Sequence, residues 1–347
     1  MIFELALVAL LQPQAIDLVK PLTFGGLTYD VKVLDPDSKY GGQGASICDA
    51  SRIVISSGST LWTLDGKFLR PLKVPERSIS SQALPQHGRA GPIVLAQYPN
   101  EVVLESLRNG KWVNFLVAKP GGRSIHCSVD EIAVGVEVSP SGLSAAAYRS
   151  GKVRLLPGPR GNSEALGVQG GVACGYVTVR GKIAAAQWRL DSVTGPEMLP
   201  TPPGLVATEA VQTDGRLTVG VGSTIAPVIE GQGLRTDRGV LWDHAKLVPW
   251  RFEKGFERTS VVPRAVLDGL VIGYTQTSHF ESQQAFVAKR DRVFLLPDIH
   301  IGISRIHFYD VKDQDRHGTL LCDAQLVQPG KANHPIACLL RPTRPAR

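Results

Sequence analysis

An internal repeat constrains the fold of this 347-residue chain more than any other feature. The repeated unit is a polar turn followed by an apolar triplet and a small residue. Its clearest copies are DGLVIGY (268–274), DEIAVGV (130–136), DGRLTVGV (214–221) and GGVACGY (170–176), and weaker copies are SRIVISS (51–57), GPIVLAQ (91–97) and HGTLLCD (317–323). Self-similarity at a period of 20–50 residues indicates a repeat architecture.

The small residue of each copy is its anchor. The anchors are Ser56, Ala96, Gly135, Gly175, Gly220, Gly273 and, least clearly, Asp323. Successive anchors lie 39 to 53 residues apart, which suits one four-stranded antiparallel sheet per unit.

A second feature follows six of the seven anchors: an apolar-aromatic strand, a short polar turn and a strand that ends in Leu or Leu-Pro. The copies are 59–72, 145–157, 184–200, 239–250, 284–297 and, more loosely, 106–116. The polar insert predicts a hairpin between antiparallel strands. Its recurring aromatic residue is Trp62, Tyr148, Trp188 or Trp242, and regular recurrence favours packing between sheets over a ligand platform.

A small-residue strand precedes most anchors, so each unit supplies four short strands. About seven such units predict an all-β fold, a β-propeller of four-stranded antiparallel blades with the small-residue strand innermost. The last unit ends at 335–342 without a Leu-Pro strand, and residues 27–36 resemble the missing strand. The sequence therefore predicts one domain, 16–347, whose ring is closed by an N-terminal strand.

The repeat resembles the bacterial HAF-repeat family, a group assigned to the cell exterior. The nearest copies of its motif are RAVLDGLVIGY, QQAFVAKRDRVFLLP and RGVLWDHAKLVPW, within a resemblance that covers most of 27–342. The namesake histidine is absent, because Gln284 precedes Ala285. The resemblance implies a shape and a location outside the cell, and it brings no catalytic residues.

The N-terminus bears on location. Residues 1–15 contain an apolar run of signal-peptide length, although Glu4 and the lack of a basic residue depart from that pattern. Export to the cell envelope or beyond is the expectation, and the cytoplasm is the alternative. We expect no membrane span, since no other segment is apolar enough.

The net charge bears on the class of partner, and the positions of the cysteines bear on whether they form disulfides. The net charge of +7 is spread along the chain, so no nucleic-acid partner is expected. Four of the five cysteines (Cys48, Cys127, Cys174 and Cys338) fall in slots that apolar residues hold in other units, which favours buried thiols over a disulfide framework. A monomer is expected.

The sequence offers no catalytic or metal-binding constellation and implies no cofactor. It lacks HExxH, a P-loop and GxSxG, and a metal site at His300, His307 and Asp310 is not favoured. The binding candidates are Glu164, Glu209 and Arg264 beside the innermost slots, and Glu230 and Arg235 in a long insertion (223–238).

These observations predict a non-enzymatic interaction protein of the exported type that binds protein or glycan on one propeller face. Two alternatives stay open. One is a propeller enzyme, a hydrolase or lyase of glycans, which would need carboxylates such as Glu164 and Glu209 in the channel. The other is a structural component of the cell surface or matrix.

Overall fold

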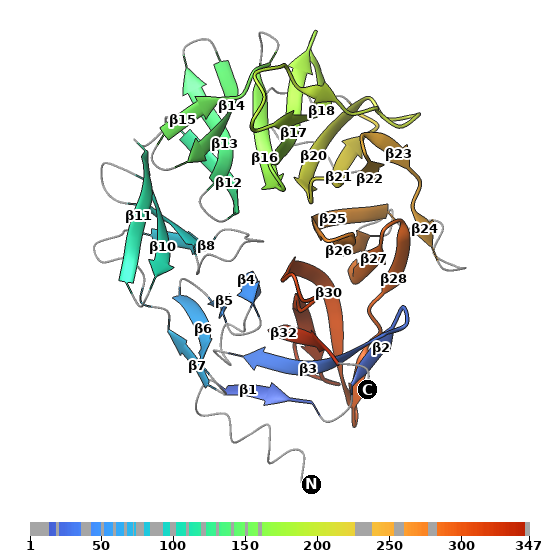
Figure 1. The fold of residues 1–347 in the computed structure, drawn as a ribbon. Coiled ribbons are helices and arrows are strands. Elements are labelled where there is room, and N and C mark those ends of the chain that lie inside the picture. The colour runs from blue at the N-terminus through green and yellow to red at the C-terminus, as the bar shows by residue number, and fades with distance from the viewer. Residues whose placement is uncertain are drawn as a thin grey trace.

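The strands are arranged as a ring of small sheets around a central axis (Figure 1). This computed structural model describes residues 14–18, 21–35, 43–49, 52–57, 60–65, 68–71, 73, 80–83, 93–97, 102–108, 111–118, 123–129, 132–139, 142–149, 152–158, 162–225, 238–252, 260–276 and 283–343. The all-β propeller fold predicted from the repeat is confirmed.

Five blades stand as separate sheets. They are β8 (Ser80–Ala83), β9 (Ile93–Gln97), β10 (Val102–Arg108) and β11 (Lys111–Ala118); β12 (Arg123–Val129), β13 (Ile132–Ser139), β14 (Gly142–Arg149) and β15 (Lys152–Leu155); β16 (Ser163–Gln169), β17 (Val172–Val179), β18 (Lys182–Arg189) and β19 (Glu197–Met198); β20 (Ala207–Thr213), β21 (Leu217–Ser223), β22 (Arg238–Asp243) and β23 (Lys246–Val248); and β25 (Ser260–Leu267), β26 (Leu270–Gln276), β27 (Gln283–Lys289) and β28 (Arg292–Leu295) with β24 (Arg251–Phe252) parallel to β28.

The remaining strands form one continuous eleven-stranded sheet, so the predicted count of seven blades is not confirmed. Its strands are β1 (Gln14–Asp17), β2 (Leu22–Phe24), β3 (Leu27–Asp35), β4 (Gln43–Asp49), β5 (Arg52–Ser57), β6 (Thr60–Asp65), β7 (Phe68–Pro71), β29 (Ile299–Ile301), β30 (Ser304–Gln314), β31 (Leu320–Val327) and β32 (His334–Pro342).

The N-terminal strand closes the ring, as the sequence predicts. Strand β3 pairs antiparallel with β32, with Val31 opposite Leu340 and Val33 opposite Cys338. Strand β1 pairs with β3 and touches β7, which joins the first and last parts of the ring. Ala15 is buried within β1, so the described sheet begins before the predicted domain boundary at residue 16.

The innermost strands explain the glycine anchors. In β16, β20 and β25 a β-bulge follows the residue opposite Gly175, Gly220 or Gly273. A Cβ atom on Gly175 would lie 1.9 Å from the carbonyl oxygen of Glu164, and one on Gly220 would lie 2.1 Å from that of Glu209. The anchor is glycine because the innermost backbone approaches too closely for a side chain.

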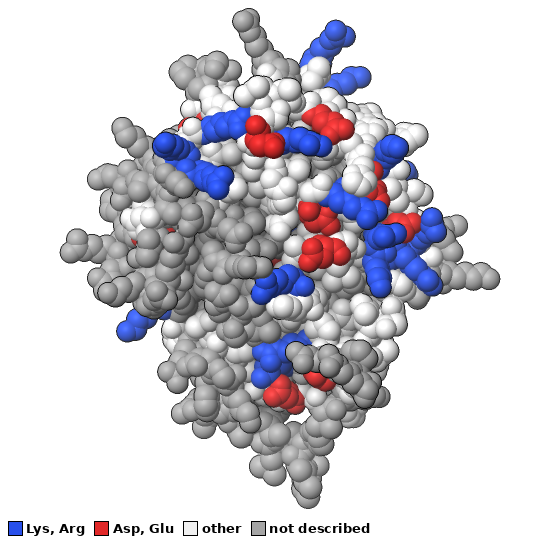
Figure 2. All heavy atoms as spheres, in the orientation of Figure 1, with Lys and Arg blue, Asp and Glu red and all other residues white. Residues whose placement is uncertain are grey.

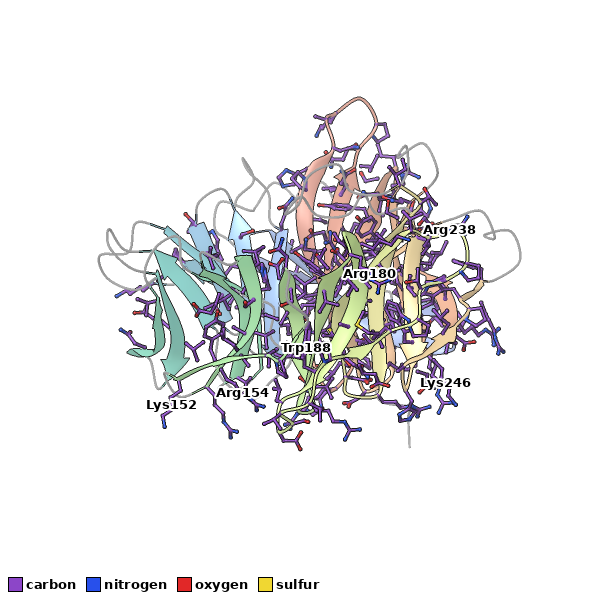
Figure 3. All side chains as sticks on the ribbon, turned by 90° about the horizontal axis from the view of Figure 1, so that it is seen from above. Lys152, Arg154, Arg180, Trp188, Arg238 and Lys246 are labelled. Atoms are coloured by element: carbon purple, nitrogen blue, oxygen red, sulfur yellow. The ribbon has the colours of Figure 1, made fainter. Side chains whose placement is uncertain are left out.

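The Leu-Pro ends and the aromatic positions fit together between neighbouring blades. Trp188 donates its Nε1–H to the carbonyl of Pro157 at 2.7 Å, and Trp242 donates to Pro200 at 2.9 Å. Both indoles are buried, and Figure 3 shows Trp188 within the body while Lys152 and Arg154 lie at the outer strand. The predicted packing role of these aromatic residues follows from this contact.

The predicted anchors are shifted by one residue in the first and the last unit. In the first unit Ile55, and not Ser56, lies opposite Gly44, the residue before a bulge of β4. Asp323 is not the anchor, because Ala324 lies opposite Phe308, the residue before the bulge of β30. Ile336 pairs with Ala324 and holds the place predicted for Cys338. Cys338 instead faces Cys322, and both are fully buried free thiols.

The described residues contain no helix with the length and apolar character needed to cross a bilayer.

Candidate functional site

Charged side chains lie on neighbouring innermost strands at the level of the bulges. We define the acidic sector as His126, Glu164, Tyr176 and Glu209, on β12, β16, β17 and β20. We define the basic sector as Arg264, Tyr274, Asp310, Lys312 and Asp323, on β25, β26, β30 and β31. In the face shown in Figure 2, acidic and basic side chains are interspersed, and one group of Lys and Arg lies toward the right-hand edge.

Glu164 is held as a carboxylate by two neighbours. The His126 imidazole forms an ion pair with Oε1, and the Tyr176 hydroxyl donates to Oε2 at 2.7 Å. Burial favours the neutral acid, but the hydrogen bonds from His126 and Tyr176 and the nearby imidazole outweigh it, so the pKa of Glu164 is lowered. Burial and the adjacent carboxylate raise the pKa of Tyr176.

Glu209 lies beside this carboxylate, but its pKa is shifted in the opposite direction. Its side chain is half-buried, and no hydrogen bond or ion pair joins it to another described residue. Burial, together with the charge of Glu164, raises the pKa of Glu209 to about 7. Two neighbouring carboxyl groups thus have pKa values driven apart, the pattern that separates an acid from a base in enzyme sites.

The basic sector is organised around a buried carboxylate. Arg264 donates from Nε at 3.3 Å and places Nη2 at 3.2 Å from Oδ2 of Asp310, and Lys312 Nζ lies 3.6 Å from the same oxygen. The Arg264 guanidinium also lies over the Tyr274 ring, 5.0 Å from its centroid. Burial raises the pKa of Asp310, although both cations oppose the shift.

Asp323 is the second buried carboxyl of this sector. It accepts a hydrogen bond from the Gly44 amide at 2.6 Å, and Lys312 Nζ lies 3.8 Å from its Oδ2. Burial raises the pKa of Asp323 to about 6, against the effect of Lys312. Its bond to Gly44 links β31 to β4, where the two ends of the ring meet.

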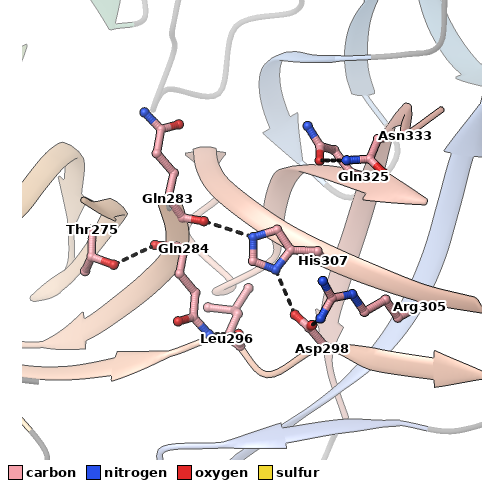
Figure 4. A network of polar contacts seen from close by, with 9 residues as sticks. All are labelled: Thr275, Gln283, Gln284, Leu296, Asp298, Arg305, His307, Gln325 and Asn333. Carbon is pink, nitrogen blue, oxygen red and sulfur yellow. Dashed lines mark hydrogen bonds and ion pairs between the residues drawn. The ribbon is translucent and has the colours of Figure 1, made fainter. Parts of the chain in front are cut away.

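A separate polar network ties β27 to the β29–β30 hairpin (Figure 4). His307 lies with Nδ1 2.9 Å from Oδ1 of Asp298 and Nε2 2.9 Å from the carbonyl of Gln283, and Arg305 donates to Asp298 Oδ2 at 3.1 Å. Both imidazole nitrogens therefore lie within hydrogen-bonding distance of an oxygen atom. This arrangement joins two sheets and serves the fold.

The structure describes three of the five predicted site residues. Glu164 and Glu209 lie in the acidic sector on adjacent innermost strands, and Arg264 lies in the basic sector. Glu230 and Arg235 fall outside the described residues, although the pairing of β21 with β22 agrees with their place in an insertion between the second and third strands.

Sequence reasoning missed the partners of these residues. His126 stands directly before Cys127 in an innermost slot, so the repeat could have placed it beside the axis. Asp310 and Asp323 carried a signal too, because they put charges at positions that other units leave uncharged. Among the described residues, no group of three or more His, Cys, Asp or Glu is arranged to hold a metal ion.

Comparisons with known proteins identify the architecture. No family model and no curated protein matches the chain. The Pyrococcus horikoshii acylaminoacyl peptidase superposes with a TM-score of 0.50 at 11% identity, over 94% of this chain and 52% of that one. The chain therefore spans about half the length of that peptidase, and the likeness shows the propeller fold.

Two further solved structures are similar at lower scores. The β-propeller domain of the Trilobed protease from Pyrococcus furiosus has a TM-score of 0.48 at 12% identity, over 94% of each chain. The tricorn protease has a TM-score of 0.41 at 12% identity, over 88% of this chain and 38% of that one.

The likeness to the acylaminoacyl peptidase contradicts the function predicted from the sequence. That prediction was an exported, non-enzymatic module for protein or glycan, with a glycan enzyme or a matrix component as alternatives, whereas the neighbour with a TM-score of 0.50 is a peptidase. The prediction was wrong because the recurring residues of the repeat report on packing alone and carry no information about the partner.

Proposed function

We propose that this chain is a peptidase-related propeller, which receives peptide segments against its innermost strands and works with a peptidase catalytic unit. The observation that carries this proposal is the row of His126, Glu164 and Glu209 on three neighbouring innermost strands, in which His126 pairs with Glu164 and Glu209 lies beside them. An extended peptide presents N–H groups and charged ends, which carboxylates on rigid strands can bind. The likeness to propellers of peptidases supports the same role.

Fluorescence anisotropy of short, labelled, unstructured peptides tests the binding part of the proposal. We expect the wild-type chain to bind such peptides and the double variant Glu164→Gln/Glu209→Gln to weaken binding by about tenfold, because it removes the charge of the acidic sector. The matched control is Glu197→Gln, an exposed carboxylate on the outer strand β19 of the same sheet as Glu164. Peptide binding that the double variant leaves unchanged would overturn the proposal.

The second part of the proposal is that the chain works with a peptidase catalytic unit, and an assay of peptide hydrolysis tests it. The purified chain is expected to bind peptides without cleaving them, and cleavage is expected once the peptidase unit is present. Hydrolysis by the purified chain alone, at a rate that survives repeated purification, would show that the catalytic groups lie within this propeller.

We also propose that the ring has seven blades. Within the eleven-stranded sheet, β4 to β7 form one four-stranded succession, and β30, β31, β32 and β3 form another. Strand β1 joins them at their outer edges through its pairs with β3 and β7. The five separate sheets and these two successions make the proposed total.

Membership in the HAF-repeat family and export from the cytoplasm stay predictions. Sequencing the N-terminus of the mature protein from separated cell fractions tests export. A mature chain that starts after Ala15 would leave only part of β1, since that strand begins at Gln14.

A further inference from the structure

The last sheet departs from the repeat at two buried positions. Asp310 follows the bulge of β30 and faces Asp323 of β31, and the two are 4% and 3% exposed. The residues that form the equivalent pair in other blades are Cys127 and Val134, Gly167 and Cys174, Gln212 and Val219, and Ala265 and Ile272. Those blades form without carboxylates, so the fold does not require this buried pair.

Burying the pair is costly to stability. Charged groups lose hydration on burial, and well-packed apolar residues often serve stability as well or better. One oxygen of Asp310, Oδ1, is buried without a hydrogen-bond partner among the described atoms, which adds to the cost. Departures of this kind from local rules concentrate at functional sites.

The effect of the pair is to fix two cations beside the axis. Asp310 Oδ2 holds Arg264 and Lys312, whose side chains are nevertheless 43% and 31% exposed. The ion pair uses the Nε–H and one Nη2–H of Arg264 at most, which leaves its other N–H groups for a ligand. The contacts of Lys312 with Asp310 and Asp323 leave at least one of its three N–H groups. The Tyr274 ring beneath the guanidinium further limits its movement.

We propose that Arg264 and Lys312 form a binding site for a carboxylate group of a peptide ligand. This inference rests on the proposed peptide-handling function and deepens it. A planar guanidinium and an adjacent ammonium suit a carboxylate, which accepts two parallel hydrogen bonds from arginine. A cationic ligand is disfavoured here, because it would meet the two exposed positive groups before reaching the carboxylates buried beneath them.

A carboxylate can come from the C-terminus of a peptide or from an acidic side chain, and three probes separate these sources. They are N-acetyl-trialanine with a free C-terminus, its C-terminal amide, and the amide of N-acetyl-Ala-Glu-Ala. Isothermal titration calorimetry on the full wild-type chain at low salt is expected to give about tenfold tighter binding for the free acid than for its amide. Binding of the glutamyl amide as tight as that of the free acid would show that any carboxylate is accepted, and weaker binding would show recognition of the C-terminus.

The comparison of the three probes uses only the wild-type chain, so its result does not depend on whether a variant folds. Equal binding of acid and amide would overturn the carboxylate site and leave the peptide-handling function standing. If no probe bound, the peptide-handling function would fail with it.

Variants assign the site to its residues. Arg264→Gln and Lys312→Gln should each reduce the preference for the free acid, and Arg264→Lys should retain part of it because the charge is kept. The matched control is Arg305→Gln, since Arg305 is an exposed arginine of β30 that pairs with Asp298 away from this site. A preference for the free acid that survives both glutamine variants would also overturn the assignment.

Discussion

Asp310 of β30 and Asp323 of β31 lie directly opposite each other in the interior of the last sheet, where the other blades hold apolar or uncharged residues. The pair positions Arg264 and Lys312 beside the axis and, through Gly44, connects the two ends of the ring. The position pair that is uncharged in four other blades therefore carries two carboxylates in the last sheet. The departure from the repeat is more informative about function than the repeat itself.

Removing the arginine of the basic sector should destabilise the protein in a pH-dependent way. Arg264→Leu leaves Asp310 buried with Lys312 as its remaining cation, so the raised pKa of Asp310 should rise further. A carboxyl whose pKa is raised by folding contributes stability at low pH that is lost as the pH rises through that pKa. We expect a loss of about 1–2 kcal/mol at pH 8 and a smaller loss at pH 5, measured by urea unfolding. Arg305→Leu is the control, and equal losses at both pH values would contradict the explanation.

Glu209 should make the protein less stable as the pH rises toward neutrality. Its pKa is about 7 in the folded chain, above its ordinary value of 4.5, so its favourable contribution is present below about pH 4.5 and is lost as the pH passes 7. Glu209→Gln cannot ionise and should stabilise the protein by about 2 kcal/mol at pH 8, with little effect at pH 4.5. Urea unfolding at the two pH values measures this. The exposed Glu197→Gln should show no such difference, and a Glu209→Gln effect independent of pH would exclude this electrostatic cause.

The hydroxyl of Tyr176 should keep Glu164 ionised. Tyr176→Phe removes the hydrogen bond to Oε2 and leaves burial less opposed, so the pKa of Glu164 should rise. Carbon-13 NMR titration of labelled glutamate side chains measures this value. The control is Tyr148→Phe, because the Tyr148 hydroxyl donates to the backbone carbonyl of Val136 in its own sheet and not to a carboxylate. An unchanged Glu164 titration in Tyr176→Phe would show that His126 alone holds the carboxylate.

The glycine anchors should tolerate no side chain. Gly175→Ala would place Cβ 1.9 Å from the Glu164 carbonyl oxygen, so the innermost strand has to move. We expect a destabilisation of about 2–3 kcal/mol in thermal or urea unfolding, together with a disturbed Glu164 titration. Gly195→Ala is the control, since nothing lies within 4 Å of its Cβ position. Near-equal stability of the two variants would show that the backbone can relax around the bulge.

Part of this architecture could be derived from sequence because the information is local. The apolar triplets, the polar turns and the Leu-Pro ends each specify a strand or a hairpin within a single unit, and their recurrence predicts the propeller. The closing role of 27–36 could also be inferred, because a unit that lacks one strand requires a complement elsewhere in the chain. Glycine recurs at four of the seven predicted anchors, and at Gly175, Gly220 and Gly273 the structure shows a close approach of the innermost backbone.

The sequence by itself thus determined the unit, its repetition and the closure of the ring, since these depend on contacts within a blade. Only the tertiary structure decided which charged residues meet. His126 and Glu164 come from different blades, and so do Arg264 and Asp310. Their contacts depend on how neighbouring sheets are rotated about the axis and on the bulges of the innermost strands, and residue spacing along the chain encodes neither. The pKa values that separate Glu164 from Glu209 follow from that same geometry, because burial and distance set them.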